Sequence, residues 1–354
     1  MKSFQRFVCC TFAALILGIS SHARAAVVCV NNAADLQTNL TTAGSNGQSN
    51  TIKIVAGTYL QSSGNGFSYS QTGNFNLTIE GGFDGTCSMQ TPKAVLTKLD
   101  GQSQLPVMVI SNAAGTTGNV TIRYLTFQNG RVLNAYPAGL SVSPFSSGWS
   151  GDLRVENCLF RDNLASNPTN AYVVYAGSNS GNVYFLDNAI VDNIVSPGFG
   201  AVLIYGGGTT LPYSAFANNN TFANNTTTDS HTAAGLVLSG SAAFSLANNI
   251  VWDGSLSDMN NFSTNAVFLN NDIDSFGQTP LTGSTGNINL DPLFIDYFNN
   301  RHVQDASPTH NSGDPSPPGT VRSIDLDGNP RTINGLIDMG AYELQDVIFA
   351  NGFE

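Results

Sequence analysis

Charged residues are scarce in this chain, and most of them are acidic. They make up 10% of the 354 residues, with 24 Asp and Glu against 13 Lys and Arg, and the formal net charge is −11. Nucleic-acid binding needs a basic patch that contacts phosphates, and this composition excludes it. Glu and Lys, which favour helices, are few, whereas glycine occurs 36 times. The composition therefore favours an all-β, turn-rich protein over a helical bundle.

Long hydrophobic runs are absent after residue 25, so the mature sequence offers no transmembrane helix. Residues 1–25 have the features of a secretory signal peptide. Lys2 and Arg6 precede an apolar run over residues 7–19, and Ala23 and Ala25 form a small-x-small cleavage site. We therefore expect an exported protein.

Histidine is also rare, and the three histidines after the leader (His231, His302 and His310) share no metal-ligand spacing. Asp325 and Asp327 stand before a glycine, as at the start of a calcium loop, but the downstream glutamate of such a loop is missing. A structural turn is the alternative interpretation. We expect no cofactor, with calcium as the one candidate.

One eleven-residue pattern occurs five times between residues 120 and 254, with starts 33, 30, 32 and 29 residues apart. The copies span residues 120–130, 153–163, 183–193, 215–225 and 244–254. Positions one and three are apolar, as in a strand with one buried face. One period cannot bury its own apolar face, but stacked periods can. The repeat predicts a single-stranded parallel β-helix with a short N-terminal helix cap and an irregular C-terminal cap, and we expect a monomer.

Four positions of the repeat carry further predictions. Position eight is apolar and predicts one inward column: Phe127, Phe160, Ile190, Phe222 and Val251. Position six predicts an internal asparagine ladder or, alternatively, a polar chemical site: Asn188, Asn220 and Asn249. Position eleven is Asn or Gly, which predicts tight left-handed corners. Position ten predicts solvent-facing turn residues or a row of calcium ligands: Asp162, Asp192 and Asp253.

Five segments follow from these patterns. After the signal peptide, residues 26–90 form an N-terminal cap with a helix over 32–43 and the first coils; residues 91–286 form the β-helix; residues 287–343 form the C-terminal cap; and residues 344–354 are a tail that could be a sorting signal. Cys158 follows the inward register and predicts a buried free thiol. Cys29 and Cys87 are then expected to form a disulfide in an oxidising compartment.

The repeats, together with Gly-Thr-Tyr at 57–59 and Gly-Gly-Phe-Asp-Gly-Thr-Cys at 81–87, resemble secreted bacterial pectate-lyase-like proteins, which implies a right-handed parallel β-helix. Four later motifs resemble the choice-of-anchor Q type C-terminal domain: Asp-Pro-Leu-Phe at 291–294, Ser-Pro at 307–308, Asp-x-Asp-Gly-x-Pro-Arg at 325–331 and Asp-x-Gly-Ala-Tyr-Glu at 338–343. Asn311 departs from that pattern, where Asp is usual. The end of the chain is similar to the tails of exported gammaproteobacterial proteins, which implies the medium or outer surface of a Gram-negative bacterium.

Two function classes are compatible with these features. The first is a non-enzymatic secreted or surface β-helix protein for adhesion or glycan contact. The second is a polysaccharide lyase or glycoside hydrolase acting on an extracellular polysaccharide. Such enzymes need calcium beside a Lys or Arg base, or convergent carboxylates. The repeats offer little of either, so we identify no catalytic residue and favour the non-enzyme.

Overall fold

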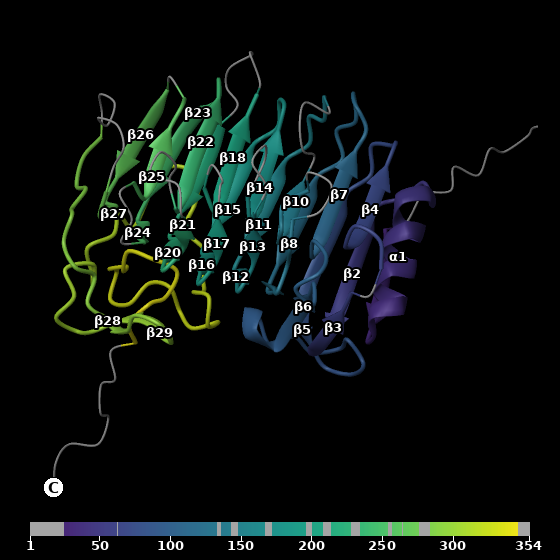
Figure 1. Cartoon of the computed structure of the whole chain (residues 1–354), viewed down its shortest axis with the longest axis horizontal. Coiled ribbons are helices and arrows are strands. Elements are labelled where there is room, and N and C mark those ends of the chain that lie inside the picture. Colours follow the sequence, from purple (N-terminus) through teal and green to yellow (C-terminus); the bar gives the residue numbers. More distant parts are fainter. Residues whose placement is uncertain are drawn as a thin grey trace, which may run out of the picture.

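A computed structural model describes residues 25–61, 63–132, 136–142, 148–166, 172–195, 200–207, 214–227, 234–253, 257–263, 265–275 and 284–345. Nearly all of the predicted signal peptide, His231, Gly254 and most of the predicted tail lie outside these ranges. The chain winds through coils that each add a strand to three parallel sheets, A, B and C (Figure 1). The predicted right-handed parallel β-helix is therefore confirmed.

Sheet A has nine strands within the described residues, in the order β1-β2-β5-β8-β11-β15-β19-β23-β26. Their bounds are β1 Ala26–Val30, β2 Asn50–Val55, β5 Leu77–Phe83, β8 Val120–Arg123, β11 Leu153–Glu156, β15 Val183–Leu186, β19 Ser214–Asn218, β23 Ala243–Ala247 and β26 Ala266–Leu269. Equal repeat positions pair across neighbouring coils, so Leu153 lies between Val120 and Val183. The repeat starts thus define the register of sheet A.

Sheets B and C complete each coil. Sheet B contains β3 Gly57–Leu60, β6 Thr97–Asp100, β9 Thr126–Gln128, β12 Leu159–Arg161, β16 Ala189–Val191, β20 Thr221–Ala223, β24 Ile250–Trp252 and β27 Asp272–Ile273. Sheet C contains β4 Phe67–Gln71, β7 Met108–Asn112, β10 Leu140–Val142, β14 Val174–Ser178, β18 Val202–Gly206, β22 Leu236–Gly240 and β25 Met259–Asn261. A small parallel sheet follows sheet B in three middle coils: β13 Leu164–Ala165, β17 Ile194–Val195 and β21 Thr226–Thr227.

The core lies inside the coils, and position eight supplies its predicted column. All five side chains of that column are at most 1% exposed. The rings of Phe127 and Phe160 stack at a centroid distance of 4.8 Å. Cys158 is a buried free thiol in the same core, and burial raises its pKa to about 12.

The prediction that position eleven turns the corners is wrong. Positive φ angles fall one residue earlier, at position ten, and also at position five. Position five comprises Tyr124, Asn157, Asp187, Asn219 and Asn248, and position ten comprises Asn129, Asp162, Asp192 and Asn224. In the coils from residue 153 onward, the residue with positive φ at a corner directs its side chain outward, and the residue after it directs its side chain into the coil. Positions six and eleven are therefore interior positions.

The first interior ladder runs from Asn188 through Asn220 and Asn249, and continues to Asn271 and Asn287. Each Oδ1 accepts a hydrogen bond from the backbone N–H of the position-six residue in the preceding coil. Where that residue is also an asparagine, its side-chain amide donates to the same Oδ1. Each Nδ2 also donates to a backbone carbonyl of the preceding coil. The ladder satisfies buried backbone groups at the corner, as buried polar groups require.

A second ladder occupies position eleven, where the sequence analysis expected only turns. Asn163, Asn193 and Asn225 repeat the same hydrogen bonds. Asp253 ends this ladder, because its Oδ1 accepts from the backbone N–H and the side-chain amide of Asn225, both at 2.8 Å. Asp253 therefore lies inside the coil, apart from the outward row of Asp162 and Asp192.

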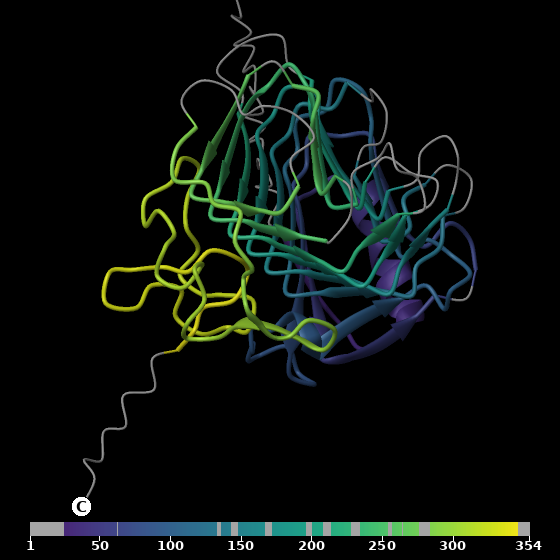
Figure 2. The same ribbon diagram turned by 60° about the vertical axis from the view of Figure 1, so that its left-hand side comes forward.

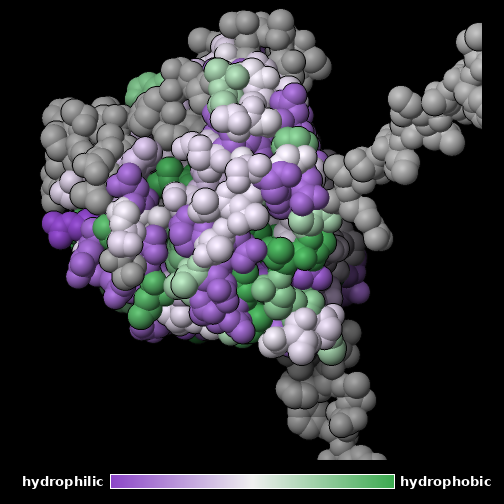
Figure 3. Space-filling model, turned by 90° about the vertical axis from the view of Figure 1, so that its right-hand side faces the viewer, coloured by the Kyte–Doolittle hydropathy of each residue, from purple (hydrophilic) through white to green (hydrophobic). Residues whose placement is uncertain are grey.

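Helix α1, Ala33–Ser45, packs across the N-terminal end beside β4, as expected of a cap. Asn32 caps it, accepting from the backbone N–H of Asp35 at 2.9 Å. The predicted disulfide between Cys29 and Cys87 is confirmed. The surface at this end mixes hydrophilic and hydrophobic residues (Figure 3), and Val27 of the first edge strand is 60% exposed.

The C-terminal segment begins as the expected cap, because Thr285 and Ile288 bridge to strands of the last coil. It then turns back along the side of the solenoid, where Figure 2 shows it as a separate layer. We call residues 290–345 the strap. The strap contains the antiparallel hairpin of β28, Phe294–Asp296, and β29, Asn300–Val303. Ile295 of β28 is 53% exposed and so does not cover the last coil.

Substitution of Phe160 by Ala should lower the free energy of unfolding by about 3–5 kcal/mol, because it leaves a cavity in the inward column. Phe262→Ala is the matched control, since Phe262 is 58% exposed, and should change stability by less than about 0.5 kcal/mol. Denaturant unfolding of both variants measures the difference. Equal effects would contradict the inward column.

Substitution of Asn220 by Ala should destabilise the protein by more than about 2 kcal/mol. The change removes the acceptor of the Asn188 backbone N–H and the donor to the Phe185 carbonyl, both buried, and each unsatisfied group costs about 1–3 kcal/mol. Asn39→Ala in helix α1 is the control, because the Asn39 side chain lies in an exposed setting. A loss no larger than that of the control would contradict a structural ladder.

Candidate functional site

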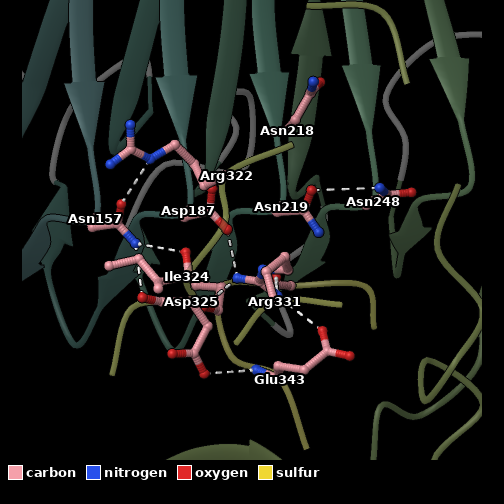
Figure 4. Close-up of polar contacts among 12 residues, drawn as sticks. Asn157, Asp187, Asn218, Asn219, Asn248, Arg322, Ile324, Asp325, Arg331 and Glu343 are labelled. Atoms are coloured by element: carbon pink, nitrogen blue, oxygen red, sulfur yellow. Dashed lines mark hydrogen bonds and ion pairs between the residues drawn. The ribbon is translucent and has the colours of Figure 1, made fainter. Parts of the chain in front are cut away.

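In successive coils, the residues with positive φ at the corner between sheets A and B bind the strap (Figure 4). The side-chain amides of Asn219 and Asn248 donate to the backbone carbonyls of residues 338 and 314. Asn157 Nδ2 donates to the carbonyls of residues 324 and 325 at 3.3 and 2.8 Å. The residues that turn each coil therefore also bind the strap.

Arg322 of the strap reaches the earliest of these coils. Its guanidinium donates to Tyr124 Oη at 2.8 Å, to Glu156 Oε2 at 2.6 Å and to Asn157 Oδ1 at 3.2 Å. Arg154 Nη1 donates to the other oxygen of Glu156 at 2.9 Å. Glu156 is thus held between a body arginine and a strap arginine.

Arg331 of the strap is fully buried, with 0% exposure. Its Nη2 donates to Asp187 Oδ1 at 2.5 Å and to the carbonyl of Ala341 at 2.7 Å. Its Nη1 donates to the carbonyl of Gly340 at 3.1 Å and lies 3.4 Å from Glu343 Oε2. Figure 4 shows Asp187 reaching this arginine from the coil side.

Several buried carboxyl groups share the single buried guanidinium of Arg331 in this network. Burial raises the pKa of Asp187 to about 7, although Arg331 counteracts it. Burial, reinforced by Asp338, raises the pKa of Glu343 to about 8. The pKa values of Asp325 and Asp338 are also raised, mainly by burial. The network therefore retains protons in the folded state at pH values where exposed carboxyls have lost theirs.

Asp325 and Asp327, the candidate calcium ligands, face different partners. Asp325 Oδ1 accepts from the backbone N–H groups of Asp327 and Asn329, and Oδ2 accepts from that of Glu343 at 3.0 Å. Asp327 Oδ2 lies 2.8 Å from His302 Nε2. These contacts agree with the turn interpretation. Within the described ranges, no cluster of three or more His, Cys, Asp or Glu could hold a metal ion.

An apolar layer joins the strap to the outer face of sheet B. The sheet contributes Leu159, Ala189, Val191, Ala223 and Ile250, and the strap contributes Phe294, Leu326, Met339 and Ala341. The strap therefore makes polar contacts at the corner and buries apolar side chains on the sheet. Only the apolar burial is expected to contribute a large favourable free energy.

A pocket of about 300 Å³ opens beside this layer. Leu159 and Val191 of sheet B belong to its lining, together with Val95 of the short 3-10 helix η1, Ala94–Leu96. The strap supplies the hairpin residues 298–302, Asp327 and Tyr342. Body and strap thus form the pocket together.

Polar side chains in the pocket are held by one another. His302 Nδ1 lies 2.5 Å from Asn300 Oδ1, and its ring centroid lies 4.3 Å from that of Tyr342. The hydrogen bond to His302 is the main cause that lowers the pKa of Asp327. Arg301 forms a close ion pair with Asp192 of the body.

Arg161, also in the pocket lining, donates to Gln128 Oε1 at 3.0 Å and lies 3.6 Å from Asp162. Asp162 and Asp192 therefore engage arginines, and Asp253 lies inside the coil, so the three do not form the row of like charges that position ten suggested. Burial raises the pKa of Asp253 well above its usual value, and Asp258 raises it further.

A larger cavity of about 570 Å³ lies at the N-terminal end between helix α1 and residues 60–68. Its described lining consists of uncharged residues, among them Ala33, Gln37 and Leu60. The pocket under the strap is therefore the better candidate, because it combines apolar surface with convergent polar groups.

Several residues of the pocket, among them Asp192, His302 and Asp327, stand out in the sequence, but their spacing does not place them together. His302 and Asp327 are 25 residues apart, and Arg301 and Asp192 are 109 residues apart. A usable signal was the outward-facing position ten, because Asp192 at that position pairs with Arg301 of the strap. The direction of the strap was not readable from the sequence.

Comparison with family models, with curated proteins and with solved structures gives no match in any of the three. The fold is therefore established by the strand arrangement alone. Across the parts of the chain that the structure describes, the single α-helix is too short and too polar to be a membrane span.

The buried network predicts a stability that falls as the pH rises from about 5 to about 8. With raised pKa values, the folded state binds more protons than the unfolded state in this range, so deprotonation favours unfolding. Glu343→Gln should flatten this slope, measured by denaturant unfolding at several pH values. Asp305→Asn is the control, because its side chain is 94% exposed. An unchanged slope in Glu343→Gln would contradict the prediction.

Proposed function

We propose that this chain is an exported, non-enzymatic β-helix protein that contacts glycans in the medium or on the outer surface of a Gram-negative bacterium. The pocket under the strap is the observation that carries the proposal. It combines planar polar side chains, such as Asn299, Asn300 and Asp192, with the aromatic rings of Phe298 and Tyr342. Amides, carboxylates and guanidinium groups hydrogen-bond hydroxyl groups, and aromatic rings cover the apolar faces of sugar rings.

The exposure of Phe298 supports a contact role. Its side chain lines the pocket and is 64% exposed, although most of the other phenylalanines among the described residues are buried. A large exposed ring beside polar groups is typical of binding surfaces. The Cys29–Cys87 disulfide is compatible with export into an oxidising compartment.

The contacts of His302 favour binding over catalysis. A general base needs a free lone pair within reach of the substrate. Both ring nitrogens of His302 already have partners, Asn300 on one side and Asp327 on the other. Asp192 is likewise engaged by Arg301. These groups hold one another in place, which suits a rigid recognition surface.

The test is a glycan array with the purified mature protein, with lyase and reducing-sugar assays in parallel. We expect saturable binding to specific glycans without turnover. Phe298→Ala should weaken that binding at least tenfold, equivalent to about 1.4 kcal/mol, whereas Phe262→Ala should leave it unchanged. Absence of glycan binding would contradict the proposal, and release of product ends would favour the polysaccharide lyase or glycoside hydrolase instead.

A further inference from the structure

Every charged side chain that lines the pocket has a partner of opposite charge. Arg301 pairs with Asp192, His302 faces Asp327, and Arg161 lies beside Asp162, which follows it in the chain. The Arg301–Asp192 pair joins the strap to the body, whereas His302 and Asp327 both belong to the strap. Arg161 and Asp162 both belong to sheet B and its corner. The pocket therefore carries no excess positive charge, whether or not His302 is protonated.

This balance disfavours an anionic ligand. A carboxylate or sulfate entering the pocket would have to displace Asp192 from Arg301 or lie beside Asp162, Asp192 and Asp327, because each cation of the lining already has a carboxylate partner. Arg301 is only 5% exposed at its side chain, so separating it from Asp192 would leave a buried charge uncompensated. Carboxylates already placed in a pocket reject negatively charged ligands by repulsion.

The same arrangement suits hydroxyl groups. Arg161 and Asp162 are 39% and 52% exposed at their side chains, so each can still bond to a ligand while keeping its partner. Arg161 supplies donors and Asp162 supplies acceptors, and a hydroxyl group can be both donor and acceptor. Val95 and Phe298 provide apolar surface at the opening.

We infer that the pocket under the strap binds an uncharged saccharide and discriminates against its uronic acid counterpart, with Asp162 and Asp192 as specificity-determining residues. The inference rests on the proposed glycan contact. Aspartates cancel the charge of the two arginines, so hydroxyl recognition remains and carboxylate recognition is lost. A pocket volume of about 300 Å³ lies at the lower end of the usual range for small-molecule sites, which suits a short saccharide.

The test compares neutral hexasaccharides with uronate hexasaccharides that differ at C6 only: glucose with glucuronate, galactose with galacturonate, and mannose with mannuronate. Calorimetric titration of the mature protein should show at least one neutral hexamer binding tenfold or more tightly than its counterpart. Its affinity should change little with salt, because no net charge is neutralised.

Asp162→Asn is the decisive variant, because it removes the acidic partner of Arg161 at an exposed position. Asp162 has φ 56°, which Asn tolerates, so the fold should be retained. We expect the affinity for the uronate hexamer to rise at least fivefold. Asp305→Asn, a charge change outside the pocket lining, should have no effect.

The outcomes separate the inference from the proposed function. Tighter binding of a uronate hexamer by the unmodified protein would overturn the inference and leave glycan contact intact. An unchanged preference in Asp162→Asn would overturn the role of Asp162. Failure to bind any hexamer of the three pairs would overturn both the inference and the proposed function.

Discussion

The side-chain amide that bonds one coil to the next is the interaction on which the rest of the structure depends. A corner in every coil exposes backbone N–H and C=O groups to the dry interior, where an unsatisfied group is costly. Asn220 resolves this by accepting from one backbone N–H and donating to one carbonyl of the preceding coil. Its amide also bonds to Asn249, so each coil fixes the position of its neighbour.

The ladders also determine where the strap can bind. An inward asparagine at position six follows a residue with positive φ, whose own side chain is directed outward. Asn219 and Asn248 use those outward amides to hold strap backbone 119 and 66 residues away. One constraint, the sharp corner, therefore produces both an interior ladder and an exterior row of hydrogen-bonding groups.

Periodic features were predictable from the sequence, and non-periodic features were not. The register of sheet A, the column that includes Phe160 and the ladder at Asn220 all follow from counting repeat positions. The second ladder at Asn193 was missed because asparagine at a corner has two physical explanations, left-handed backbone and an inward amide. The strap has no period, so its direction depends on contacts such as Asp187 with Arg331, which only folding brings together.

The docked strap and the pocket are thermodynamically linked, because the pocket is lined from both sides. Leu159 and Arg161 come from the body, whereas Arg301, His302 and Tyr342 come from the strap. A ligand that contacts both sides binds only the docked state, so it stabilises docking by its own binding free energy. Conversely, the protons held by the buried network favour docking at low pH. A protein with this design would bind its ligand most tightly where the strap is most firmly held.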